Sequence, residues 1–295
     1  MQQLSLIVAC TDRKVEAPSP QLTARSLPDL PTADRCGLWM ERLSTTDADT
    51  YPLDHLYKGD SWVQQRVLIE ELQRRVATRA LVASAGLGLQ DLDSAHPSYA
   101  ATFSQGHEDT VCPSDLSGTW WLGLQGGIGS VRISELSGLI LAVLSTPYAR
   151  AMDAELRDLG MRTDTDVLLI GGWKDIPGIT RIPADRTLRR ALGGTVGSLL
   201  PRMAQQWVRL WGGGNLTSES ALASWTEWVE SASFREHFSR QPLEDRQVVE
   251  FIHQLRSQEP GVSATIALRA LRDAGFACEQ KRFGRLFAAS REVAA

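Results

Sequence analysis

The stretch LSLIVACTDRK at residues 4–14 begins as an apolar run, stops at Cys10 and continues at once with polar and charged residues. Three later runs have the same apolar character: residues 80–84 (ALVAS), 139–144 (LILAVL) and 167–170 (VLLI). Continuous apolar runs, rather than alternating ones, are typical of strands that are covered on both faces. We therefore expect residues 4–9 and these three runs to form a mainly parallel sheet.

Helical patterns lie between the apolar runs. Residues 61–78 carry apolar side chains at helical spacing, with Ser61 as the expected N-cap. Residues 149–159 and 198–211 read as further helices, and Pro201 falls in the first turn of the latter, where proline is tolerated. This alternation of strands and helices predicts a three-layer α/β domain over residues 1–212.

A second, smaller domain is expected over residues 221–295. The stretch GGGNLTSES at 212–220 has the glycines and small polar residues of a boundary, and no strand-like run follows it. Helices are expected at 221–238, 243–258, 263–274 and 278–289. Because Gly275 lies between the last two, they have the spacing of a helix-turn-helix in an all-helical domain.

The totals describe an ordinary soluble protein. The 295 residues are 43% hydrophobic and 22% charged, with a formal net charge of −4. The four cysteines form no CxxC pair and no zinc-spaced set, and no signal peptide is recognisable. The longest apolar run, 139–144, is far too short to span a bilayer. A cytoplasmic protein without metal, cofactor or membrane association is expected.

Common catalytic motifs are missing from the chain. It contains no GxSxG elbow, no HExxH, no GxxxxGK and no convincing GxGxxG. Ordinary serine hydrolases, zinc proteases, P-loop proteins and dinucleotide-binding enzymes are therefore disfavoured.

The ends of the four expected strands are polar or rich in glycine. Ligands of parallel α/β sheets bind at the carboxyl ends of the strands. We therefore expect ligand contacts from strand ends and the loop at 84–103, namely Cys10, Thr11, Ser84, Gly86, Gly88, Tyr99, Ser145 and Gly171. Asp12, Lys14 and Asp93 are the candidate catalytic residues, since carboxylates and amines can move protons or attack a substrate. The alternative is that these ends are polar only because they meet water.

The stretch LGGTVGS at 192–198 opens the helix that runs to residue 211. Glycines and hydroxyls at a helix N-terminus suit phosphate, so Thr195, Ser198 and Arg202 are candidate contacts to a nucleic-acid backbone. A helix cap with a solvated flank explains the same residues nearly as well.

Positive charge is concentrated near the C-terminus. Residues 263–291 hold six cations against two acids, a local net charge of +4 in a chain of net charge −4. Lys281, Arg282 and Arg285 are the candidate DNA contacts on the last helix. The alternative is a helical hairpin that docks on its own domain.

The motifs of the first hundred residues resemble a bacterial and phage domain group. They are Cys10 and Lys14 with three residues between them, the segment SAGLGL at 84–89, and Pro97-Ser98-Tyr99. That group has a Cys-Ser-x-x-Lys start and a Ser-Ala-Lys-x-Gly-Leu segment, and it is related to YaaA-type proteins and to queuine tRNA-ribosyltransferase. The Cys-x3-Lys element is also similar to the core motif of archaeosine synthase.

The resemblance extends over residues 1–110 at most, and the chain departs from it. Thr11 stands where serine is usual, Gly86 stands where lysine is frequent, and no Lys-Pro-Tyr follows Lys14. The resemblance implies an α/β, glycosylase-like domain that handles a purine or deazapurine base in nucleic acid. Such proteins often belong to DNA-modification or anti-phage systems, so duplex DNA and other subunits are the expected partners.

Three functions follow from these observations. The leading hypothesis is base excision or base exchange at the glycosidic bond, with Asp12 or Asp93 as the carboxylate and Lys14 as phosphate anchor or nucleophile. The second is a non-catalytic DNA-binding or sensor subunit of a defence complex. The third is a small-molecule enzyme that acts on a nucleoside and uses the C-terminal helices to oligomerise.

Overall fold

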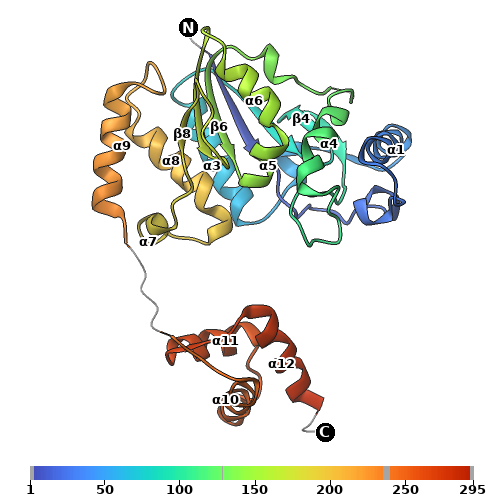
Figure 1. The fold of residues 1–295 in the computed structure, drawn as a ribbon, viewed down its shortest axis with the longest axis vertical. Helices are drawn as coiled ribbons and strands as arrows, with labels where there is room; N and C mark the ends of the chain where they lie inside the picture. The colour runs from blue at the N-terminus through green and yellow to red at the C-terminus, as the bar shows by residue number, and fades with distance from the viewer. Residues whose placement is uncertain (1–2, 128, 235–239, 293–295) are drawn as a thin grey trace. The chain divides into compact units, whose positions relative to one another are not determined.

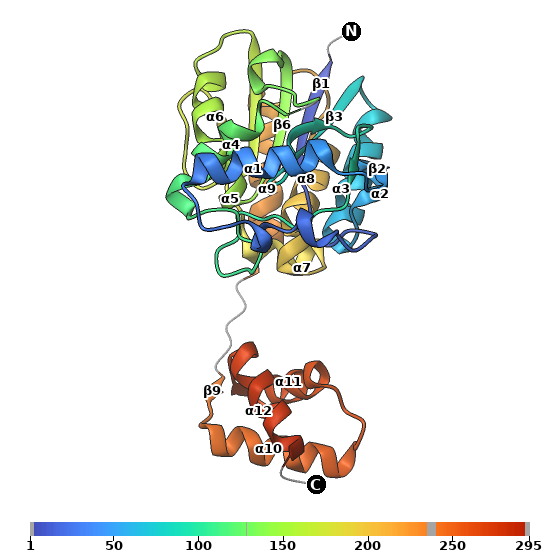
Figure 2. The same ribbon diagram turned by 90° about the vertical axis from the view of Figure 1, so that its right-hand side faces the viewer.

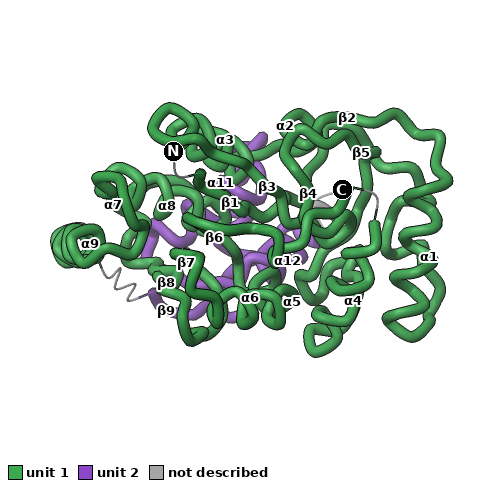
Figure 3. Tube along the Cα trace, turned by 90° about the horizontal axis from the view of Figure 1, so that it is seen from above, with its two compact units in different colours: residues 1–234 green, residues 235–295 purple. Residues whose placement is uncertain are grey.

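A computed structural model describes residues 3–127, 129–234 and 240–292 of the chain. The chain divides into two compact units, residues 1–234 and 235–295, which Figure 3 distinguishes by colour. Each unit is described by itself below.

Unit 1 is built on a six-stranded sheet with the order β4-β3-β1-β6-β7-β8. All neighbouring strands are parallel except β3 and β4, which form an antiparallel hairpin. The strands are β1 (Leu4–Ala9), β3 (Thr78–Ser84), β4 (Gly88–Asp91), β6 (Gly138–Leu144), β7 (Thr165–Gly171) and β8 (Thr180–Ile182).

The four apolar runs form the four central strands, so the prediction of a mainly parallel sheet is confirmed. Their side chains are almost wholly buried because helices cover both faces of the sheet. The two outer strands, β4 and β8, have no such apolar run, and the sequence pattern did not predict them.

Helices cover the sheet on both faces, as Figures 1 and 2 show, which confirms the three-layer α/β architecture. One face carries α3 (Asp60–Gln73) and α8 (Leu199–Leu210), with α9 (Glu219–Ala232) packed on α8. The other face carries α1 (Thr32–Thr45), α4 (Ser117–Leu124), α5 (Thr146–Ala151) and α6 (Asp153–Gly160).

Two expected helices differ in detail. The N-cap of α3 is Gly59, at φ +105°, and not Ser61, which lies inside the helix. The helix expected at 149–159 is two helices, α5 and α6, which meet at Met152.

Short elements complete unit 1. A small antiparallel pair joins β2 (Thr50–Pro52) to β5 (Ala95–Pro97), with α2 (Leu53–Leu56) directly after β2 and α7 (Arg189–Leu192) ahead of α8. Single 3-10 turns lie at Pro20–Leu22, Ala24–Ser26, Ser114–Leu116, Ile133–Glu135, Arg186–Leu188 and Val196–Ser198.

The boundary between the units lies after Phe234 and not at residues 212–220, which corrects the predicted domain limits. The glycine-rich stretch is a loop that leads into α9, and Asp166 at the start of β7 accepts a hydrogen bond of 2.5 Å from Thr217 Oγ1. Trp225 of α9 packs on Trp207 of α8, with ring centroids 5.6 Å apart. Burial of these indoles holds α9 on unit 1.

Unit 2 has three helices and its own core. Its helices are α10 (Asp245–Gln258), α11 (Ala264–Asp273) and α12 (Gln280–Glu292), packed around Val248, Ile252, Leu271 and Phe283. A two-residue parallel pair, β9 (Gln241–Pro242) with β10 (Phe276–Ala277), departs from the all-helical prediction. Residues 274–279 between α11 and α12 include β10 and exceed the usual turn of a helix-turn-helix, which therefore stays a prediction.

Within the described ranges, no helix combines the length and the apolar character that crossing a bilayer requires.

Candidate functional site

The strand order places a topological switch point between the carboxyl ends of β1 and β6, which are neighbours in the sheet. The chain passes from β1 to β3 on one side of it and from β6 to β7 on the other side, and the helices directly before β3 and β7, α3 and α6, cover opposite faces of the sheet. Neighbouring strands whose connections leave in opposite directions open a crevice, where open α/β sheets bind their ligands.

Cys10 and Tyr148 meet across this crevice. Cys10 directly follows β1, and Tyr148 lies on α5, which follows β6; the thiol Sγ and the phenol oxygen are 3.0 Å apart. The phenol also accepts a hydrogen bond of 3.3 Å from the backbone N–H of Ala85 at the end of β3. Three strand ends that are distant in sequence are therefore joined by one tyrosine.

A buried chain of hydroxyls lies beside this pair. Ser84 Oγ accepts hydrogen bonds from the backbone N–H groups of Gly86 (3.0 Å) and Leu87 (3.1 Å). It also lies 2.5 Å from the Tyr99 hydroxyl, which is 2.7 Å from that of Tyr57. Since two N–H donors occupy both lone pairs of Ser84 Oγ, its own proton points to Tyr99, and Tyr99 in turn donates to Tyr57.

Burial raises the pKa of Tyr57, Tyr99 and Tyr148 well above the ordinary value of a phenol. All three are consequently neutral hydrogen-bond donors at physiological pH. The proximity of Cys10 raises the pKa of Tyr57 further, whereas the hydrogen bonds with Tyr99 and Ser84 lower it. Cys10 itself is half-buried.

Lys14 lies over the tyrosine chain. Its side chain is buried, with Nζ 4.3 Å from the centroid of the Tyr99 ring and 3.1 Å from the backbone oxygen of Asp12, to which it donates. Burial lowers the pKa of this ammonium because the charged form loses its hydration. Nearby Cys10 and the carboxylates of Asp12 and Asp109 favour the charged form and act against that shift.

No described carboxylate lies within ion-pair distance of Lys14 Nζ. The amine contacts aromatic faces and one carbonyl oxygen, so its positive charge is not neutralised by a salt bridge. A lysine of lowered pKa in a crevice is suited to nucleophilic or acid–base chemistry.

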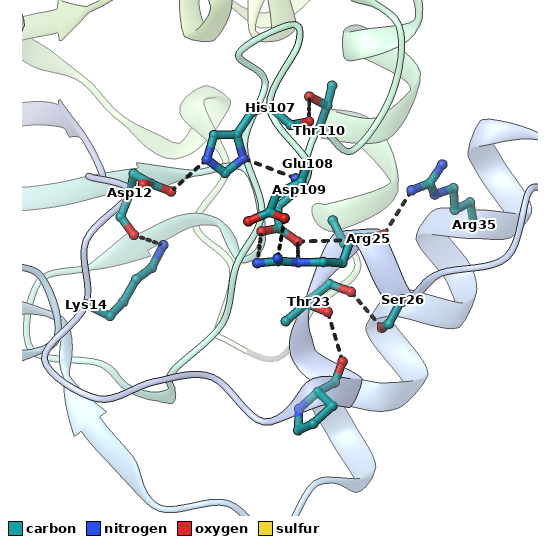
Figure 4. Close-up of polar contacts among 12 residues, drawn as sticks. Asp12, Lys14, Thr23, Arg25, Ser26, Arg35, His107, Glu108, Asp109 and Thr110 are labelled. Atoms are coloured by element: carbon teal, nitrogen blue, oxygen red, sulfur yellow. Dashed lines mark hydrogen bonds and ion pairs between the residues drawn. The ribbon is translucent and has the colours of Figure 1, made fainter. Parts of the chain in front are cut away.

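The rim of the site comes partly from residues that the sequence pattern did not identify. His107 Nε2 lies 3.9 Å from Asp12 Oδ1, and its Nδ1 accepts from the backbone N–H of Asp109, as Figure 4 shows. Asp109 is buried and holds Arg25 through two side-chain hydrogen bonds of 3.0 and 2.7 Å. The only signal in the sequence is the polar run His107-Glu108-Asp109, which no motif connects with residue 12.

The other candidates from the first strand end lie outside this cluster. Asp12 is exposed at the rim of the site, where its carboxylate faces His107. Thr11 donates to the backbone oxygen of Lys58 (3.2 Å) and so ties the strand end to the start of α3.

Asp93 does not belong to this site. Because β4 runs antiparallel to β3, the chain returns from Gly88 toward the start of β3, where Leu92 N–H bonds to Ala80 O. Asp93 therefore lies beyond the far end of this hairpin, away from Cys10 and Ser84, and its proposed catalytic role is not supported by its position.

The predicted glycines are explained by neighbouring atoms of the protein and by their backbone conformation. A Cβ on Gly86 would lie 2.6 Å from the Tyr99 ring, and one on Gly171, at φ +99°, would overlap Leu144 O. Gly88 turns the β3–β4 hairpin at φ +75°. Ser145 is the N-cap residue of α5, and its backbone oxygen accepts from Ala149 N–H. None of these positions needs a ligand to explain its residue.

The start of α8 lies at the same edge of the sheet, but its predicted contact residues already have hydrogen-bond partners within the protein. Thr195 and Ser198 form a reciprocal capping box. Arg202 donates to Ser198 Oγ and Leu192 O, and its guanidinium lies 3.3 Å from Asp60 Oδ1. These contacts match the helix-cap alternative.

The predicted DNA contacts of unit 2 differ among themselves. Lys281 and Arg285 are exposed on α12. Arg282 instead donates to Asp245 Oδ1 (2.7 Å) and Leu243 O (2.9 Å), which fixes α12 to the start of α10. Arg282 is therefore a structural residue.

A cleft of about 600 Å³ lies among α4, α5, α6 and Trp173, the second residue after β7. Its lining includes Trp121, Arg150, Glu155 and Trp173. Arg150 and Lys174 lie 5.0 and 4.1 Å from the centroid of the Trp173 ring, which is 37% exposed. Burial raises the pKa of Glu155, whose Oε2 accepts from Trp121 Nε1. The volume of the cleft suits a small-molecule or nucleotide ligand.

The parts of the chain that the structure describes hold no group of three or more His, Cys, Asp or Glu side chains arranged for a metal ion. Comparisons of the chain with protein-family models, with curated proteins and with solved structures found no match.

Proposed function

We propose that the crevice at the ends of β1 and β6 is the active site of an enzyme that cleaves the glycosidic bond of a base in DNA. The observation that carries this proposal is Lys14, an amine whose pKa is lowered by burial and which has no carboxylate partner among the described residues. A lowered pKa increases the fraction of the amine in the neutral form, and that is the form that attacks a sugar carbon.

In the proposed reaction, Lys14 Nζ forms a bond to the sugar C1′ as the bond from C1′ to the base breaks. The base leaves with the electron pair and takes a proton from the enzyme. The amine loses a proton and the sugar ring opens to a protonated imine, which water hydrolyses to release the sugar and restore the lysine. Asp12 at the rim, 3.9 Å from His107, is placed to stabilise the positive charge on the sugar.

A chain of buried hydroxyls lies beside Lys14. Phenols that stay protonated form a hydrogen-bonded chain from Ser84 through Tyr99 to Tyr57, and Tyr148 bonds to Cys10. In this proposal Cys10 lines the site, and Tyr148 sets the orientation of its thiol.

A nucleic-acid substrate is favoured by the cleft lined by Trp173. Trp173 offers an aromatic platform with Arg150 and Lys174 beside it, a combination that stacks bases and attracts phosphates. In unit 2, the exposed Lys281 and Arg285 are available for contacts with the DNA backbone.

The test is base release combined with borohydride trapping. DNA with ordinary and deazapurine bases, single-stranded and duplex, is incubated with the protein, and released bases and reduced protein–DNA adducts are measured. Lys14→Ala is expected to lower both by at least about 100-fold. The matched control is Lys58→Ala, which removes an exposed lysine just ahead of α3 in the same region and leaves both signals unchanged.

Two outcomes contradict the proposal. If Lys14→Ala still forms the adduct, the nucleophile is a different group. If the protein binds a modified base in DNA, releases none and gives no adduct, the crevice serves recognition, and the sensor function replaces the enzymatic one.

A further inference from the structure

A second, smaller pocket lies against the β3–β4 hairpin. It has a volume of about 230 Å³ and is enclosed by the end of α1, the hairpin, β5 and the loop after α4. Its walls are largely apolar, from Met40, Leu43, Leu87 and Pro97. Cys10, Lys14 and the site tyrosines do not line it.

Two buried polar atoms of this pocket lack a hydrogen-bond partner, Gln90 Oε1 and His96 Nε2. Gln90 is 1% exposed, and its Nε2 donates to Leu87 O at 2.8 Å. That bond fixes the orientation of the amide, so Oε1 remains as an unused acceptor. Leaving such a buried group unsatisfied costs about 1–3 kcal/mol, which a ligand that donates to it would offset.

The pocket is electrically neutral. Burial lowers the pKa of His96, so its imidazole is uncharged at physiological pH. Apart from His96, none of the lining residues has a side chain that ionises. A charged ligand would lose its hydration there without gaining an ion pair.

We propose that this pocket binds a small neutral aromatic heterocycle whose ring N–H donates to Gln90 Oε1. Apolar walls with few polar groups are typical of small-molecule sites, in which the polar groups fix the orientation of the ligand. A cavity of about 150 Å³ holds benzene, so a pocket of about 230 Å³ has room for two fused rings. His96 Nε2 offers a second polar contact to such a ring.

Indole and benzothiophene are suitable probes because they share size and shape, and only indole carries a ring N–H. Their dissociation constants are measured on the full chain by titration calorimetry or ligand-observed NMR. The wild-type protein is expected to bind indole about threefold to tenfold more tightly than benzothiophene, the difference that one hydrogen bond makes.

Gln90→Leu is expected to abolish that preference, because it keeps the side-chain volume and removes the acceptor. The control Gln254→Leu, on the exposed surface of α10, should bind both probes as the wild type does. Ser44→Phe, which fills the pocket from the last turn of α1, should weaken both probes together, and it tests the site even where Gln90→Leu fails to fold.

The inference is wrong if indole shows no saturable binding, if the wild type binds both probes equally, or if Gln90→Leu keeps the preference for indole. It is independent of the proposed function, since Lys14→Ala should bind indole as tightly as the wild type.

Discussion

The end of β1 and the start of α8 lie at the same edge of the sheet, and each places a cation near a glycine: Lys14 lies over Tyr99, which packs on Gly86, and Arg202 packs on Gly194. At the start of α8, Arg202 already has Asp60, Ser198 and Leu192 O as partners. At the end of β1, Lys14 Nζ has one backbone oxygen and aromatic rings. The difference teaches that a cation at a strand end or helix start indicates a ligand site only where no partner in the protein compensates its charge.

The glycines of the two regions differ in the same way. Gly86 leaves room for the Tyr99 ring, which supports the buried hydroxyl chain. Gly197 lies in the turn before α8, and a Cβ added there would have Thr195 Oγ1 as its nearest neighbour, at 3.7 Å. Three predictions test this comparison.

The largest effect is expected from Gly86→Ala. The added methyl would overlap the Tyr99 ring, which its hydrogen bonds hold in place, so the free energy of unfolding should fall by about 1–3 kcal/mol. The control Gly197→Ala should change it by less than about 0.5 kcal/mol. Urea denaturation measures both, and equal losses would show that the two turns are equally constrained.

Arg202→Met should have a smaller effect, a loss of about 1 kcal/mol at neutral pH, since its partners are partly exposed. Hydrogen bonding with Ser198 and the charge of Arg202 hold the pKa of Asp60 below its ordinary value. The resulting stability is present above about pH 4, the unfolded pKa, and is lost as the pH falls through the folded pKa.

Denaturation at pH 6 and at pH 2.5 checks this prediction. The difference between wild type and Arg202→Met should shrink at the lower pH. A difference that is independent of pH would mean that Arg202 acts through packing and not through Asp60.

The smallest effect is expected from Lys14→Met. Because burial lowers the pKa of Lys14, the charged lysine carries a penalty in the folded state below that pKa. The penalty disappears as the pH rises toward about 10.4, the unfolded value. The variant should therefore gain less than about 1 kcal/mol relative to wild type at pH 7, because lost contacts with Tyr99 offset part of the gain.

The measurement is the difference in unfolding free energy between Lys14→Met and wild type from pH 7 to pH 10. It should decrease steadily with pH. A difference that grows toward pH 10 would contradict a lowered pKa and remove the main support for a nucleophilic Lys14.

The sequence predicted those parts of the fold that depend on local patterns of apolar and polar residues. Continuous apolar runs such as 139–144 identified the central strands, and the convergence of Cys10 and Ser84 followed from parallel strand ends meeting at one edge. Asp93 was misplaced because nothing in the short segment after Gly88 distinguishes an antiparallel return from a loop that stays at the edge.

The sequence by itself determined the α/β class, the edge of the sheet at which polar residues gather, and the position of Lys14 beside that edge. Only the tertiary structure decided which of these groups are already satisfied. Tyr57, Tyr99 and Tyr148 come from segments far apart in the chain, and so do Arg202 and Asp60. Their pairing, burial and pKa depend on distances of a few ångströms between such segments, which composition and spacing along the chain do not fix.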